Sequence, residues 1–222
     1  NYDFQGTAPF LALRSDKPLT EAVAAGLAEA LKDPQIRRDM GEGTDPRQMV
    51  WWMTDLTEIV LLDFILSQQD RIGNIDHVEH WVWVENGEVK SRKAASHGKE
   101  TEPLPEGAVR IKRTHLNDND AGGRVEYANF AKSTGMLDDM HHYPVRLYRQ
   151  LMALEADLIA EGPLHGYLKT SFGLSDRQFA QLVKNTLLAA ATLRSQCQAG
   201  VIQFDLDPET FMLTGSATPE TI

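Results

Sequence analysis

The centre of the chain reads HWVWVENG over residues 80–87, and this stretch decides how the surrounding sequence is interpreted. Tryptophan and valine alternate over residues 80–84, as in a β-strand with two different faces. Asn86-Gly87 is a strong turn signal because both residues tolerate positive φ. The chain is expected to return from Glu88, and a further alternating stretch over residues 109–115 predicts another strand that ends near Leu116.

Helices are expected on both sides of this β-region. Upstream, an amphipathic pattern predicts a helix over residues 20–32 that Asp33-Pro34 terminates, since the residue before proline avoids helical geometry. Asp45 and Pro46 have the character of an N-cap and first helical position, and the helix that follows is expected to reach about Leu66. The short apolar run over residues 10–13 is interpreted as a strand.

The last third of the chain is also predicted to be helical. One helix is expected over residues 144–161, with Gly162 at its C-cap. Ser175 and Gln178 match a capping box, and the helix they begin is expected to stop at Gly200. No repeat or interdomain linker is evident, so residues 1–222 are predicted to form a single, mainly helical α+β domain.

Two polar segments flank the predicted β-region, and both carry metal-binding side chains. The first contains Asp70, Arg71 and Asn74, and the second contains Asp118-Asn119-Asp120. If residues 80–84 share a sheet with residues 109–115, the two segments converge. Oxygen ligands from two loops suit Mg²⁺, which favours one or two carboxylates together with substrate phosphates. A further aspartate could orient a hydroxyl nucleophile or take its proton.

This order of motifs resembles the catalytic half of the atypical protein-kinase-like superfamily. Residues 70–74 (DRIGN) look like the Asp-Arg loop of HipA-like, phosphatidylinositol, secretory-pathway and CotH kinases, and residues 116–121 (LNDNDA) look like their metal-binding element. The resemblance covers about residues 10–200. It implies a kinase C-terminal lobe in which a small β-hairpin carries the catalytic and metal-binding loops.

The resemblance also implies roles for individual residues. Asp70 would be the catalytic aspartate, with Arg71 beside it in the same catalytic motif. Asp118 would be the main ligand of Mg²⁺ or Mn²⁺ and would contact ATP with Asn74, while Asn74 and Asp120 would complete the metal site. The implied activity is ATP-dependent phosphotransfer to a hydroxyl acceptor on a protein, a sugar or a lipid headgroup.

The sequence departs from this pattern, and two alternatives to an active kinase stay open. Asn74 follows Asp70 by four residues instead of five, and Asp120 stands where glycine is usual. With only about seventy residues before the catalytic loop, the N-terminal lobe is expected to be absent from this chain, and a separate lobe is an expected partner. A non-catalytic, pseudokinase-like binding or regulatory module is therefore one alternative. A metal-dependent hydrolase using Asp70, His77, Asp118 and His141 is the other.

Composition narrows the range of partners. The chain has 22 basic and 32 acidic residues, for a net charge of -10, which disfavours nucleic acid as a partner. Its most apolar run, residues 59–62, ends at Asp63 and is too short to cross a bilayer. Cys197 is the only cysteine, which favours a cytoplasmic location over a periplasmic or secreted one. The start at Asn1 fits a processed chain or a fragment.

Overall fold

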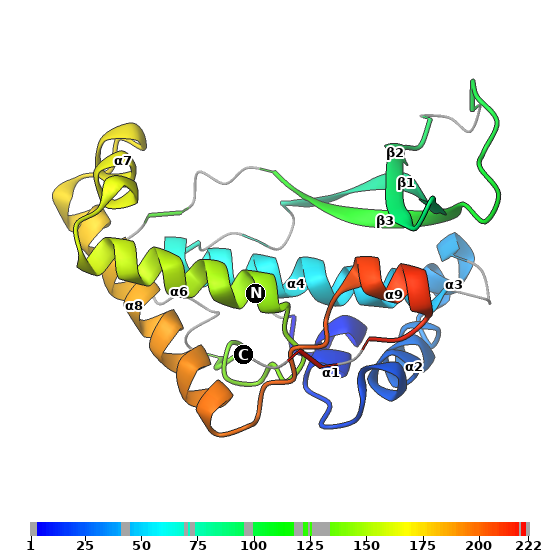
Figure 1. The fold of residues 1–222 in the computed structure, drawn as a ribbon, viewed down its shortest axis with the longest axis horizontal. Helices are drawn as coiled ribbons and strands as arrows, with labels where there is room; N and C mark the ends of the chain where they lie inside the picture. Colours follow the sequence, from blue (N-terminus) through cyan, green and yellow to red (C-terminus); the bar gives the residue numbers. More distant parts are fainter. Residues whose placement is uncertain are drawn as a thin grey trace.

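The computed structural model describes residues 4–40, 45–68, 71, 74–95, 100–117, 122–123, 125, 134–217 and 219–220, with the backbone alone at 39–40. The protein is α+β, about 52% helical, with a small three-stranded antiparallel sheet. Figure 1 shows the arrangement. The helices and strands are α1 (Ala8–Leu13), α2 (Leu19–Ala30), α3 (Pro34–Met40), α4 (Pro46–Leu66), β1 (Ile75–Glu85), β2 (Glu88–Lys93), β3 (Val109–Leu116), α6 (Val145–Ile159), α7 (Pro163–Ser171), α8 (Asp176–Gln198) and α9 (Pro208–Thr214).

Helix α4 is the element around which the others pack. It contacts α1, α2, α8, α9 and β3, and its apolar side chains form much of the main core. The predicted N-cap is confirmed, because the Asp45 side chain accepts a hydrogen bond from the Arg47 amide at 2.8 Å and Pro46 begins the helix. The helix ends at Leu66, as expected, and Ser67 follows in the left-handed region with φ of 53°.

The predicted β-region is also confirmed. Strand β1 is central, with β2 and β3 antiparallel on its two sides. Asn86 and Gly87 have φ values of 53° and 77°, so the β1–β2 turn takes the positive-φ geometry that this dipeptide favours. Val82 and Ile111 are buried on one face of the sheet and pack with Met212 of α9.

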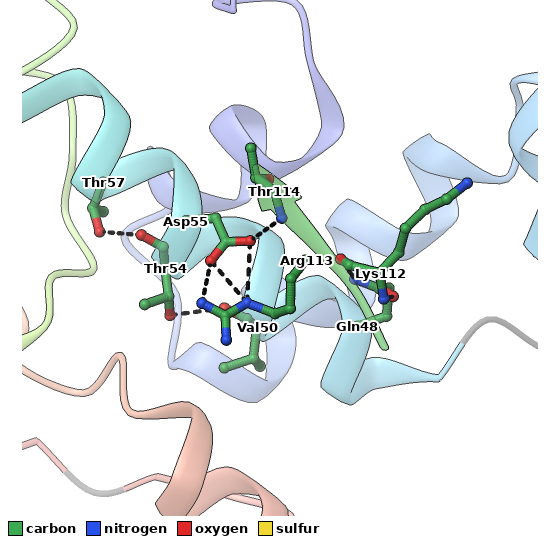
Figure 2. Close-up of polar contacts among 8 residues, drawn as sticks. All are labelled: Gln48, Val50, Thr54, Asp55, Thr57, Lys112, Arg113 and Thr114. Carbon is green, nitrogen blue, oxygen red and sulfur yellow. Dashed lines mark hydrogen bonds and ion pairs between the residues drawn. The ribbon is translucent and has the colours of Figure 1, made fainter. Parts of the chain in front are cut away.

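Helix α4 covers the outer edge of β3 with side chains spaced along one face. The Gln48 side chain donates to the Lys112 carbonyl at 2.9 Å and accepts from the Lys112 amide at 2.7 Å. Two turns later, Asp55 accepts from the Thr114 amide at 2.8 Å and pairs with Arg113 (Figure 2). Between Gln48 and Asp55, the Trp51 ring lies under the Arg113 guanidinium, with the guanidinium carbon 4.1 Å from the ring centroid. Backbone groups that an edge strand leaves unpaired are satisfied here by a helix.

Two expectations about local structure are wrong, and one helix was not predicted. Residues 10–13 lie in α1 instead of a strand, and α1 packs closely on α2 because Gly26 has no side chain: a Cβ there would lie 2.9 Å from that of Ala12. Asp33-Pro34 does terminate α2, but it also begins α3, since the Asp33 carboxylate accepts from the Gln35 amide at 2.7 Å. Gly162 is the N-cap of α7, not the C-cap of α6. The C-cap of α6 is Ala160, and Glu161, which follows it, takes positive φ.

Two other helix boundaries follow the sequence. Ser175 and Gln178 form the predicted capping box at the start of α8. The helix ends at Gln198, and Gly200 follows with φ of 70°. Within the part of the chain that the structure describes, no helix combines the length and apolar character needed to cross a membrane.

Candidate functional site

The two acidic segments begin and end beside each other. Ile75, directly after the first segment, pairs with Leu116, directly before the second. The Asn117 amide donates to the Asn74 carbonyl at 3.1 Å, and the Gly123 amide donates to the Leu66 carbonyl at 2.6 Å. The ends of both segments therefore meet where α4 passes into β1. Asp70, Asp118, Asn119 and Asp120 themselves lie outside the described residues.

Arg71 anchors the first segment to α4. Its guanidinium and the Asp63 carboxylate are each only 1% exposed, and they pair through Nε at 3.0 Å and a terminal nitrogen at 2.7 Å. A two-pronged ion pair fixes orientation as well as position. Arg71 directly follows Asp70 in the chain. A direct catalytic role for Arg71 stays a prediction.

Helix α8 supports the same region from the other side. The Asn185 side chain is buried and donates to the Ile65 carbonyl at 3.0 Å and to the Ser67 hydroxyl at 2.9 Å. Gln181, one turn earlier, donates through its side-chain nitrogen to the side-chain oxygen of Asn185 at 2.7 Å. The end of α4 is therefore held by polar contacts from α8 as well as by the apolar core.

The half-buried Asn74 lies at the junction between the first segment and β1. Its amide donates to the Arg71 carbonyl at 3.1 Å. On the neighbouring strand end, the Asn117 side chain donates to the Asp76 carboxylate. Carboxylates and carboxamides of this kind suit Mg²⁺ or Mn²⁺. The described residues include no group of three or more His, Cys, Asp or Glu side chains placed to hold a metal. Asp118 and Asp120 are not among the described residues.

The two histidines of the hydrolase alternative, His77 and His141, lie in different parts of the fold. His77 lies on β1, where burial and the Lys112 charge lower its pKa from the ordinary value, against opposing effects of Asp55 and Asp76. His141 follows the loop after residue 134, and its amide donates to the Leu13 carbonyl at 2.8 Å. Its Nδ1 atom lies 2.8 Å from an Asp16 oxygen, without the geometry of a hydrogen bond.

A buried histidine–carboxylate pair was not predicted from the sequence. His142 and Asp205 are 0% and 2% exposed, and His142 Nδ1 lies 2.9 Å from the carboxylate. The pair holds residues 141–143 beside residues 203–206, where the Tyr143 amide also donates to the Gln203 carbonyl at 3.0 Å. A lone aspartate between apolar Phe204 and Leu206 is the one signal in the sequence, because such a position favours burial with a partner.

A cavity of about 960 Å³ adjoins the junction of the two segments. Trp52, Leu56 and Ile59 of α4 form one wall, at spacings that place them on one helical face. The facing wall is the sheet, with Ile75 and His77 from β1 and Lys112 and Thr114 from β3. Residues 4–9 (except Gln5), the end of α2 and the start of α3 also line the cavity. Ile75 is the residue directly after Asn74, so the cavity begins where the candidate site ends.

Comparison with known proteins yields no match for this chain among family models, curated proteins or solved structures.

Proposed function

We propose that this protein is an ATP-dependent phosphotransferase of kinase-like architecture, acting with Mg²⁺ or Mn²⁺ on a hydroxyl acceptor. The observation that carries the proposal is the meeting of the two acidic segments at the end of α4, through the Asn117–Asn74 and Gly123–Leu66 backbone hydrogen bonds. Two loops joined at both ends can supply oxygen ligands to one site. The order of helix, acidic loop, sheet and acidic loop also agrees with the C-terminal lobe that the sequence resembles.

Five polar residues of the two segments have roles in this proposal. Asp118 is the principal metal ligand, with Asn74 and Asp120 as further ligands. The metal, when bound, neutralises charge on the phosphates of ATP. Asp70 orients the acceptor hydroxyl and takes its proton, while the acceptor oxygen forms a bond to the γ-phosphorus and the bond to the β–γ bridging oxygen breaks to release ADP. Arg71 positions Asp70 through its ion pair with Asp63.

Asp70→Asn is the variant that tests this role. It keeps the shape of the side chain but cannot take a proton, so we expect metal-dependent phosphate transfer from ATP to fall by about 10²- to 10⁴-fold. Release of ADP, with Mg²⁺ and then Mn²⁺, is the measurement. Asp138→Asn is the matched control, because Asp138 is an exposed carboxylate that loses the same charge.

The outcomes separate the phosphotransferase from its alternatives. Equal ADP release by Asp70→Asn and the unaltered protein would contradict the proposed role of Asp70. No ADP release by the unaltered protein with either metal would favour the non-catalytic kinase-like module. The four-residue step from Asp70 to Asn74, closed by the Asn74–Arg71 backbone bond, is the feature that favours that second candidate.

A further inference from the structure

The cavity between α4 and the sheet has the dimensions and lining of a small-molecule site. Its volume of about 960 Å³ lies within the range of ligand pockets. The lining is mostly apolar, and the wall formed by α4 contributes the Trp52 indole beside Leu56 and Ile59. Polar side chains from the sheet and from the α2–α3 region complete the pattern, because polar groups in an apolar pocket fix the orientation of a ligand.

Most charges around the cavity already have partners. Lys32 pairs with Glu29 at 2.6 Å, and Asp33 caps α3. Glu79 stands opposite Lys112 in the sheet register but pairs with Arg110 instead.

Lys112 differs from these residues. Among the described residues, its ammonium is in no ion pair, and Figure 2 shows the side chain extending away from the Asp55–Arg113 pair. Both backbone polar groups of Lys112 are bonded to the Gln48 side chain, and Lys112 faces Glu79 of β1 in the sheet register. The strand position of Lys112 is therefore fixed while its ammonium remains available to a ligand.

We propose that this cavity binds an amphipathic organic anion, with its apolar body against α4 and its single anionic group at Lys112. The apolar wall supplies the area that an apolar chain or ring would bury, and the ammonium supplies the charge that selects an anion. His77 lies diagonally across from Lys112 on the same face of the sheet and lines the same cavity. This inference goes beyond the proposed phosphotransfer and does not rest on it.

Calorimetric titration with two probes tests the inference on the full chain. Decanoate supplies the apolar body with an anionic group, and decan-1-ol supplies a similar body without charge. We expect decanoate to bind, and Lys112→Met to weaken it by about tenfold, because a charge-assisted hydrogen bond is lost while the stem remains. Binding of decan-1-ol is expected to be unchanged by Lys112→Met.

Two further variants define the site. Lys93→Met is the matched control, because Lys93 is an exposed strand lysine on β2 that does not line the cavity. Thr114→Trp fills the cavity from β3 with a residue that strands accept, and it is expected to abolish binding of both probes. The backbone bond from Thr114 to Asp55 does not involve the side chain that is replaced.

Two results would overturn the inference. One is the absence of decanoate binding to the unaltered protein. Another is an equal effect of Lys112→Met and Lys93→Met on decanoate. If decanoate does not bind, binding of adenosine that Thr114→Trp abolishes would assign the cavity to a nucleoside base.

Discussion

Replacing Asp63 by alanine is expected to destabilise the protein by about 3–5 kcal/mol, because it leaves the Arg71 guanidinium buried without its carboxylate. Both side chains are 1% exposed, so water cannot replace the lost partner unless the segment moves. Urea unfolding of the Asp63→Ala variant measures the loss. A change below about 1 kcal/mol would contradict the anchoring role assigned to this pair.

Two controls separate the buried pair from a general effect of charge. Glu29→Ala removes an exposed ion pair with Lys32 and is expected to cost less than about 1 kcal/mol. The double variant Asp63→Leu with Arg71→Met replaces both charges by apolar groups. We expect it to be more stable than Asp63→Ala alone, because no buried charge is then left unpaired.

Asp55→Ala is expected to have the second largest effect on stability, about 2–3 kcal/mol. The substitution removes the acceptor of the Thr114 amide at the edge of β3 and the partner of Arg113. Arg113 is 33% exposed, so solvent screens part of its lost interaction, and most of the expected cost comes from the unsatisfied amide and from packing.

Hydrogen exchange at the Thr114 amide tests whether the effect of Asp55 arises at the edge of β3. Exchange is expected to accelerate in Asp55→Ala, and to accelerate less in Asp55→Asn, which retains a carbonyl oxygen as acceptor. An unchanged rate at Thr114 in both variants would contradict the covering of the β3 edge by α4. Gln48 also binds that edge, at Lys112, so part of the sheet contact is expected to survive.

Features determined by neighbouring residues could be predicted from the sequence. Asp45-Pro46, Asn86-Gly87 and the Ser175 capping box all act through bonds or dihedral angles within a few residues, and all three are present in the structure. The strands β1 and β3 were predictable for a similar reason, because the residue types alternate along each strand between its two faces. The meeting of the ends of the two segments, at Asn74 and Asn117, followed from pairing those strands.

Features that depend on distant residues could not be predicted in the same way. The run over residues 10–13 is too short for its period to distinguish a strand from a helix, and packing against α2 and α4 decides the outcome. Arg71 reads as a surface charge in a polar segment, yet Asp63 on the preceding helix accounts for its burial. Asp55 and Arg113 lie 58 positions apart, and no local signal links them.

The central claim, that both acidic segments form one metal–nucleotide site, is tested most directly by a thermal titration with ATP in the presence and absence of Mn²⁺. The proteins are the unaltered chain, Asp118→Ala and the control Asp138→Ala. At ATP about 100-fold above its dissociation constant, we expect Mn²⁺-dependent stabilisation of roughly 5–10 °C in the unaltered chain and the control. We expect no such stabilisation in Asp118→Ala. An equal shift in Asp118→Ala, or no shift in the unaltered chain, would contradict the proposed site.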